Sequence, residues 1–378
     1  MNRNHVRAGL CAGAAGLLGL FATACGSSED APAGAKNLSF ELTDQGCLPH
    51  QASAPAGPIA FEAENTGSSK VTEIEVMEGD TILGEKENLS EGLSGSFSLT
   101  LDAGKYTIYC PGGDAERGTL TVSGELKAKG SAKADAAVAD YREYLEENAN
   151  HLVLQTKPFV AAVVAGNVSE AKSLYPLARA YYERIEPVAE SFGDLDPRID
   201  APENENDLAS SEFGGFHRIE KALWQEGSAE AIGPVARQLQ ADVEELAEEV
   251  ETVDLQAVQI ANGADELLDE VSASKITGEE ERYSHTDLVD FEANVEGAEA
   301  AFEAVKPLPD ESDPELSGEL EADFKMVFAE LQPYRKGNGF VSYTELTRAD
   351  TRKLAQSIET LAEKLGRVPA AIAAAEGA

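Results

Sequence analysis

A short segment of this chain places a histidine and a glutamate three residues apart. In EFGGFHRIEKALW (212–224), the helical repeat puts His217 and Glu220 on one face of a helix. An imidazole and a carboxylate at this spacing are competent metal ligands. The same spacing also suits a buried core histidine beside a solvated glutamate. The pair is therefore a candidate metal site that needs support from other segments.

A second segment, ARAYYERIEPVAESFGDLD (178–196), places two glutamates at the same spacing. Glu183 and Glu186 share a helical face and could together chelate a hard cation. They could equally form ion pairs with Arg179 or Arg184, which lie in the same segment.

A third segment, YSHTDLVDFEANVEGAEAAF (283–302), carries a polar stripe. On a continuous helix Tyr283, Asp287, Asp290 and Asn294 fall on one side. A buried acidic stripe needs a partner charge or a metal ion. Alternatively, a turn near Thr286 caps the helix, and the acidic residues are solvated.

The histidine pattern argues against a standard zinc peptidase. Such sites use H-E-x-x-H or H-x-x-E-H, but Arg218 follows His217 and Lys221 follows Glu220. Beyond the N-terminal segment the chain has these histidines: His50, His151, His217 and His285. The second zinc histidine is therefore missing at either spacing.

The region 37–124 holds two cysteines, Cys47 and Cys110. An exported protein often joins such a pair in a disulfide, although two thiolates could also ligate a metal. A blue-copper site needs two histidines and a cysteine, and His50 is the one histidine in this region. Electron transfer by such a copper site is therefore not expected.

Four glutamates alternate in the stretch TEIEVMEGDTILGEKEN of the same region. Glu73 and Glu75 form one pair, and Glu85 and Glu87 form another, so each pair shares a sheet face. A solvated face accounts for this pattern, and so does a carboxylate site for a cation.

The patterning divides the chain into a β part and an α part. Residues 37–124 contain short alternating runs punctuated by Gly, Pro, Asn and Asp, which predicts a small β-sandwich of about seven strands. Residues 125–134 read as a linker, and residues 135–378 as an all-α domain of two packed helix bundles. Pro158, Pro176 and Pro187 are expected to kink or end helices. The predicted helices are 135–166, 168–192, 207–226, 229–250, 253–272, 278–305, 314–332 and 344–365.

The N-terminus reads as a targeting segment. Arg3 and Arg7 precede a short apolar run, and small residues precede Cys25. Residues 1–24 resemble a bacterial lipoprotein signal peptide, followed by a polar linker over 25–36. This implies an extracytoplasmic protein anchored to the cell membrane by lipid on Cys25. The alternative is an ordinary signal peptide and a periplasmic protein.

The charge balance narrows the possible partners. The formal net charge is −39, which argues against a nucleic-acid binder and against basic patches on an anionic membrane. An acidic chain suits metal cations or a basic partner, although solubility alone would also account for it.

The three helical segments together resemble a known family. FHRIEKALW, YYERIEPVAESFGDLDPRID and YSHTDLVDFEANVEG are similar to the imelysin-like domain of EfeO-type periplasmic iron-uptake proteins, over most of 135–378. The resemblance implies a metal site centred on His217 and Glu220. Carboxylates of Glu183, Asp287 and Asp290 would complete it. An oxygen-rich site with one imidazole suits Fe³⁺ or Fe²⁺, and copper or zinc could also bind.

The β part resembles the cupredoxin-like N-terminal domain of the same family. That domain has cysteines at the places of Cys47 and Cys110 and acidic residues at those of Glu73, Glu75, Glu85 and Glu87. The resemblance implies a second metal site, with Cys47, Cys110, Glu75 and Glu87 as its candidate ligands, and a Cys47–Cys110 disulfide is the alternative.

Three functions follow from these observations. The first is a non-enzymatic, lipid-anchored component that captures iron and passes it to a membrane permease. By resemblance its partners are an iron permease and a haem peroxidase. The second is a metallopeptidase of the imelysin class, and the third is an acidic adhesion or binding module without catalysis.

Overall fold

The computed structural model describes residues 36–377, apart from 80, 126–130, 204–212 and 312. The predicted signal peptide, Cys25 and nearly all of the first linker lie outside this part of the chain, as does the middle of the second linker. Residues 31–378 form one compact unit, to which the strands and the helices both belong.

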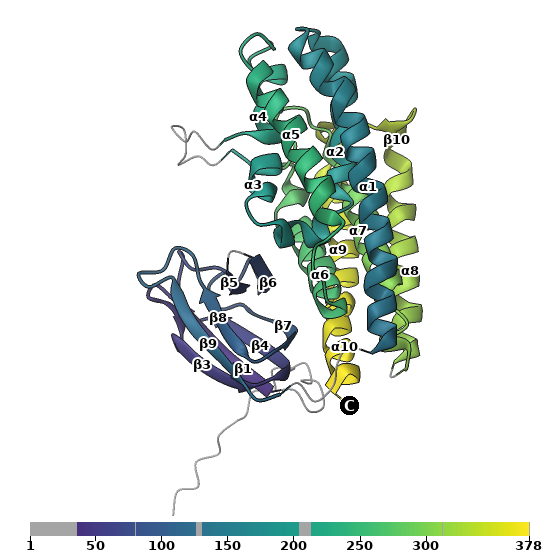
Figure 1. Ribbon diagram of the computed structural model, residues 1–378. Coiled ribbons are helices and arrows are strands. Elements are labelled where there is room, and N and C mark those ends of the chain that lie inside the picture. Colours follow the sequence, from purple (N-terminus) through teal and green to yellow (C-terminus); the bar gives the residue numbers. More distant parts are fainter. Residues whose placement is uncertain (1–35, 80, 126–130, 204–212, 312, 378) are drawn as a thin grey trace, which may run out of the picture. The chain divides into compact units, whose positions relative to one another are not determined.

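Two sheets form the β part (Figure 1). The first sheet has the order β2–β1–β4–β7, with β1 Lys36–Thr43, β2 Gly46–Leu48, β4 Gly57–Asn65 and β7 Ser94–Leu101. The second has the order β3–β9–β8–β5–β6, with β3 Gln51–Pro55, β5 Ile74–Glu78, β6 Thr81–Lys86, β8 Gly104–Tyr109 and β9 Arg117–Ser123.

The interior of this β part is apolar and aromatic. Phe61 stacks on Phe97 with ring centroids 4.8 Å apart and on Phe40 at 6.4 Å. All three are buried in one core cluster with residues of both sheets. The predicted β-sandwich is confirmed, and β2, β3 and β6 are strands beyond the predicted runs. Strands β2 and β3 are short. All residues of β6 (TILGEK) are half-buried, so apolar and polar residues do not alternate along it as they do in a strand with one buried face.

Helices follow from residue 132 onward, and this all-α part is likewise confirmed. They pack in two groups: α1, α2, α4 and α5 contact one another, and α6 contacts α7, α9 and α10. Helix α7 also packs on α1 and α2, so a single buried core joins the groups. None of the described helices is long and apolar enough to cross a membrane. The helices are α1 Ala132–Val164, α2 Val168–Glu183, α3 Leu195–Asp200, α4 Gly215–Trp224, α5 Gly233–Val250, α6 Ala257–Ala273, α7 Asp287–Val305, α8 Pro314–Leu331, α9 Arg348–Leu365 and α10 Arg367–Gly377.

Two of the three prolines do not end a helix. Pro158 lies inside α1 and Pro176 inside α2. Each proline removes one backbone hydrogen bond, but the burial of the apolar face of its helix stabilises the helix by more than that loss. Pro187 does behave as expected. Helix α2 ends at Glu183, and a 3₁₀ segment, η1 Glu186–Phe192, takes over.

The predicted helix 278–305 is wrong in its first third. Gly278 and His285 have φ values of 81° and 58°, in the left-handed region that interrupts a right-handed helix. Helix α7 therefore begins at Asp287, directly after Thr286. Tyr283 lies in the preceding loop and is not part of a helical stripe with Asp287.

Candidate metal centre

Helix α4 carries the His217–Glu220 pair into the protein interior. Its first residue, Gly215, has φ 60°, and a Cβ there would lie 1.9 Å from the carbonyl oxygen of Ile199 in α3. Glycine thus lets α4 start in contact with the end of α3. His217 and Glu220 are 3% and 1% exposed, so both side chains are buried.

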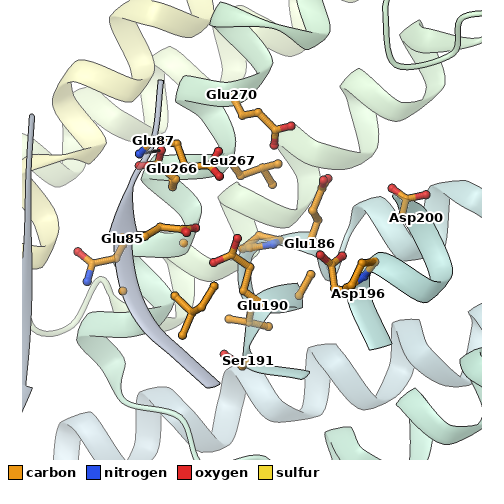
Figure 2. Close-up of a pocket in the computed structure, with 18 of the residues that line it drawn as sticks. Glu85, Glu87, Glu186, Glu190, Ser191, Asp196, Asp200, Glu266, Leu267 and Glu270 are labelled. Atoms are coloured by element: carbon orange, nitrogen blue, oxygen red, sulfur yellow. Dashed lines mark hydrogen bonds between the residues drawn. The ribbon is translucent and has the colours of Figure 1, made fainter. Parts of the chain in front are cut away.

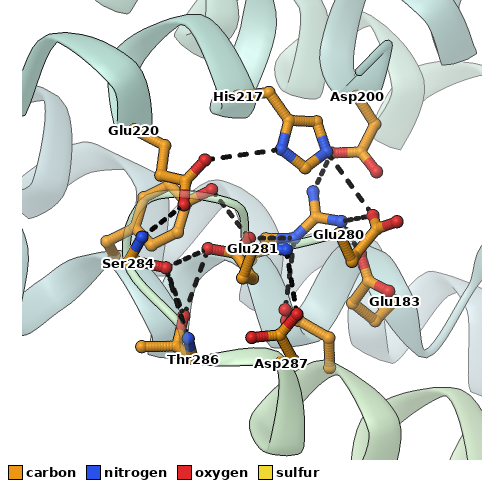
Figure 3. A network of polar contacts seen from close by, with 12 residues as sticks. Glu183, Asp200, His217, Glu220, Glu280, Glu281, Ser284, Thr286 and Asp287 are labelled. Atoms are coloured by element: carbon orange, nitrogen blue, oxygen red, sulfur yellow. Dashed lines mark hydrogen bonds and ion pairs between the residues drawn. The ribbon is translucent and has the colours of Figure 1, made fainter. Parts of the chain in front are cut away.

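The two ring nitrogens of His217 face different carboxylates (Figure 3). The Nδ1 atom lies 3.9 Å from Oε2 of Glu220. The Nε2 atom lies 3.4 Å from Oε1 of Glu280 and 3.6 Å from Oδ1 of Asp200. Ligand atoms of Asp200, His217 and Glu280 all lie within 4.8 Å of one another, which is close enough to hold one ion.

Glu220 is fixed by the loop that precedes α7. The backbone amides of Tyr283 and Ser284 donate to its Oε1 at 2.9 and 2.6 Å. Burial alone would raise the pKa of Glu220, but its contacts with His217 and with these amides lower it. The Glu220 carboxylate is therefore a fixed anion beside Nδ1.

Arg179 of α2 lies in the middle of the cluster and is fully buried. Its guanidinium forms ion pairs with Asp200 and Glu280, and with Glu183 at 2.7 Å and Glu281 at 2.8 Å. The ligand carboxylates thus already have one internal counterion, with which an incoming cation would have to compete.

The other predicted ligands, Glu183, Asp287 and Asp290, are buried in the same network. Asn294 Nδ2 donates to Glu183 Oε2 at 2.9 Å, and Asp287 Oδ1 accepts from the amide of Glu281 at 3.2 Å. Asp290 lies 3.6 Å from the Nε atom of Arg179. The structure brings these three residues near His217, but the compact group around Nε2 contains Asp200 and Glu280 instead.

Acidic groups outnumber basic ones in this interior, and the pKa values reflect it. Burial raises the pKa of Glu281 to about 8 and that of Asp287 to about 6. Burial also raises the pKa of Asp290 well above its usual range. Burial would lower the pKa of His217, but Glu220 and Glu280 outweigh it and raise the pKa to about 9.

Several buried polar atoms of the cluster make no hydrogen bond to any described residue. They include Nε2 of His217, Oε2 of Glu220 and both carboxylate oxygens of Asp290. Buried polar groups normally find hydrogen-bond partners, so these atoms are candidate ligand atoms for a cation. One imidazole among carboxylates suits a hard or borderline metal ion.

The β part differs from the predicted second site. Cys47 and Cys110 form a disulfide, so neither offers a thiolate to a metal. Glu75 is 7% exposed and pairs across the sheet with Glu85, but it does not join the compact carboxylate group. That group consists of Glu85, Glu87 and Glu190, whose ligand atoms lie within 4.8 Å of one another (Figure 2). Of the four glutamates considered from the sequence, Glu85 and Glu87 belong to it, and Glu73 and Glu75 do not.

Sequence reasoning missed Asp200, Glu280 and Glu190 as candidate ligands. Asp200 ends the motif YYERIEPVAESFGDLDPRID, and Glu280 lies just before YSHTDLVDFEANVEG, so both were near quoted segments. Neither shares a helix with His217, and no spacing rule connects them. Glu190 lies on η1 and meets β6 only in the folded chain.

Comparisons with known proteins agree with this architecture. The imelysin family model matches residues 137–368, and a cupredoxin-like domain model matches residues 15–122. Proteins named iron uptake system component EfeO, from Escherichia coli K12, Shigella flexneri and Shigella sonnei Ss046, are each 39% identical over 345 residues. Each alignment covers 88% of this chain and 90% of the relative. The chain belongs to the imelysin family and is of the EfeO type. The predicted resemblance and fold class, a cupredoxin-like sandwich followed by an imelysin domain, are thereby confirmed.

Proposed function

We propose that this protein binds iron at the His217 cluster as the extracytoplasmic component of an iron-uptake system. Relatives of this chain are named as components of an iron uptake system, which supports a role in iron uptake. The buried group of Asp200, His217 and Glu280 offers ligand atoms for the ion. The observation that carries the proposal is the unpartnered Nε2 of His217, buried between the carboxylates of Asp200 and Glu280.

The geometry favours different roles for His217 and Glu220, one as a ligand and the other as the charged partner of the ligand's second ring nitrogen. Nε2 of His217, with Asp200 and Glu280, forms the ligand group. Glu220, 3.9 Å away on the Nδ1 side, favours a proton on that nitrogen by its charge and leaves Nε2 to the ion. Metal-binding histidines commonly have such an outer carboxylate. Glu183, Asp287 and Asp290 surround this group and offset the charge of a bound Fe²⁺ or Fe³⁺.

A carrier must also release its cargo. Carboxylates exchange faster than a closed thiolate cage, and the nearby guanidinium of Arg179 can replace the ion on Asp200 and Glu280. This supports delivery to a membrane permease, with a haem peroxidase as the further partner of the system. We also propose that lipid on Cys25 anchors the protein outside the cytoplasm.

Calorimetric titration tests this function directly. Fe³⁺, Fe²⁺, Cu²⁺ and Zn²⁺ are titrated into residues 26–378, and His217→Ala/Glu220→Ala is titrated in parallel. We expect one tight iron site that the double variant loses while its circular dichroism is unchanged. Equal, weak binding of all ions by both proteins would contradict the proposal and favour the acidic adhesion module.

The imelysin family model carries a peptidase name, which makes hydrolysis the second candidate. Among the described residues no second histidine joins His217, so the zinc-peptidase ligand set is incomplete there. Peptide cleavage that disappears in Glu220→Gln would favour this candidate over iron binding alone.

A further inference from the structure

A cavity of about 380 Å³ lies between strand β6 and the helical segments η1, α3 and α6. Figure 2 shows Glu85 and Glu87 on one side of it, Asp200 on the opposite side, and Glu186 and Glu190 between them. The β part is held at this place by Lys86, which forms ion pairs with Asp269 and, at 2.9 Å, with Glu266 of α6.

This cavity reaches the candidate metal centre. Asp200 and Glu280 line it, and the same two carboxylates face Nε2 of His217. The imidazole of His217 is 4% exposed, and its Nε2 atom has no hydrogen-bond partner among the described residues. A buried, unpartnered ligand atom therefore lies at one end of the cavity. The compact group of Glu85, Glu87 and Glu190 lies at the other.

Lys275 lines the same cavity and lies near a carboxylate of the candidate metal centre. It is 4% exposed, and among the described residues that line the cavity it is the one basic side chain. Its Nζ atom lies 2.5 Å from Glu186, 3.6 Å from Glu183, and 4.0 Å from Glu280. The ammonium thus contacts carboxylates of both the cavity and the centre, in a position that a mobile cation would otherwise take.

We propose that the cavity is the route by which a metal cation reaches His217, with Glu85, Glu87 and Glu190 as its first contacts and Lys275 as the gate. This inference rests on the proposed iron binding. These three carboxyl groups can give up their protons to an incoming cation and offer it oxygen ligands. The Lys275 ammonium repels the incoming ion until it moves aside, so it slows both loading and release.

Loading kinetics test the route separately from binding itself. The chain has a single tryptophan, Trp224, which lies on α4 with His217, so its fluorescence is the signal used to follow metal binding. Anaerobic Fe²⁺ is mixed with residues 26–378 in a stopped-flow instrument, and equilibrium affinity is measured on the same samples.

Two pairs of variants isolate the mouth of the route. Glu85→Gln/Glu87→Gln should load about tenfold more slowly, with an affinity for Fe²⁺ close to that of the wild type. Glu64→Gln/Glu78→Gln makes the same two substitutions at exposed positions of the β part and should load within about twofold of the wild type. Equal rates for the two double variants would overturn the route.

Lys275→Met tests the gate. We expect loading and release both to accelerate by about tenfold, because an opposing charge has been removed. Lys325→Met, at an exposed site, is its control. A folded Lys275→Met protein with wild-type rates would overturn the gate. Should this variant fail to fold, the glutamate pair still decides the route. Absence of any Fe²⁺ binding by the wild type would instead contradict the proposed function.

Discussion

At the scale of single residues, His217 joins two carboxylate environments through its two nitrogens. Glu220 is fixed on the Nδ1 side by two backbone amides, whereas Asp200 and Glu280 face Nε2 and share Arg179. The contacts with Glu220 and Glu280 also keep the imidazole protonated at neutral pH, since its pKa is about 9. A metal ion at Nε2 must therefore displace a proton.

This displacement predicts proton release on iron binding. At pH 7 the imidazole of His217 carries two ring protons, and the proton on Nε2 must leave before a metal ion can bind there. Binding should therefore release at least about one proton from the protein. Affinity should rise with pH up to about 9, where His217 loses its proton in the free protein. Calorimetry in buffers of different ionisation enthalpy measures the release, and heats independent of the buffer would contradict this account.

The separate roles of Glu280 and Glu220 predict different losses of affinity. Glu280→Gln removes a ligand and should weaken iron binding by more than about 100-fold, whereas losing an outer-shell partner in Glu220→Gln should cost about 10-fold to 100-fold. Glu230→Gln, an exposed change near α4, serves as the control. Equilibrium titration compares the three. A larger loss in Glu220→Gln than in Glu280→Gln would assign the ligand role to Glu220.

At the scale of elements, the position of α4 depends on its first residue. Gly215 has φ 60° and leaves no room for a Cβ beside the carbonyl of Ile199. Because α3 ends at Asp200 and α4 carries His217, this one contact brings two candidate ligands together.

Substitution of this glycine should therefore disturb the site without touching a ligand. Gly215→Ala should lower the free energy of unfolding by about 1–3 kcal/mol, from backbone strain and the clash. It should also weaken iron binding. Gly166→Ala is the matched control, because Gly166 has φ 72° but open space around its Cα. Urea denaturation and iron titration compare the two, and equal effects would mean that the clash with Ile199 is unimportant.

The same elements show which parts of the site the sequence could predict. His217 and Glu220 were predictable because they lie on one regular helix, where spacing fixes the shared face. Glu280 was not, since the helical period ran through 278–286 and gave no sign that His285 adopts a left-handed conformation. Glu190 was missed because no local pattern reveals that η1 packs against β6. The β-sandwich was predicted from alternation, except where strands were short or half-exposed on both faces.

At the scale of the whole molecule, acidic side chains of the β part and the α part are brought together in one cavity. Burial raises the pKa of Glu87 to about 9 and that of Glu190 to about 7. Nearby carboxylates add to both, although a hydrogen bond with Glu85 partly lowers the pKa of Glu190. An acid whose folded pKa is raised binds more protons in the folded state than in the unfolded state. Stability then falls as pH rises between the unfolded value of 4.5 and the folded value.

Removing this ionisable group should stabilise the metal-free protein at alkaline pH. With a chelator present, Glu87→Gln should raise the free energy of unfolding by about 1–3 kcal/mol at pH 8, because ionisation of Glu87 in the unfolded chain no longer favours unfolding. At pH 4 the carboxyl is largely neutral in both states, so the variant and the wild type should be nearly alike. Glu64→Gln, an exposed change, should have little effect at either pH. Denaturation at both pH values provides the check, and a benefit that persists undiminished at pH 4 would exclude ionisation as its cause.

The most direct test of iron binding at Nε2 is anomalous diffraction at the iron edge from crystals of the iron-loaded protein. The account predicts one strong peak within bonding distance of His217 Nε2 and of the carboxylates of Asp200 and Glu280. Glu220 should lie on the Nδ1 side of the ring and should not bind the ion. A protein that carries iron elsewhere, or whose peak lies away from Nε2, would contradict it.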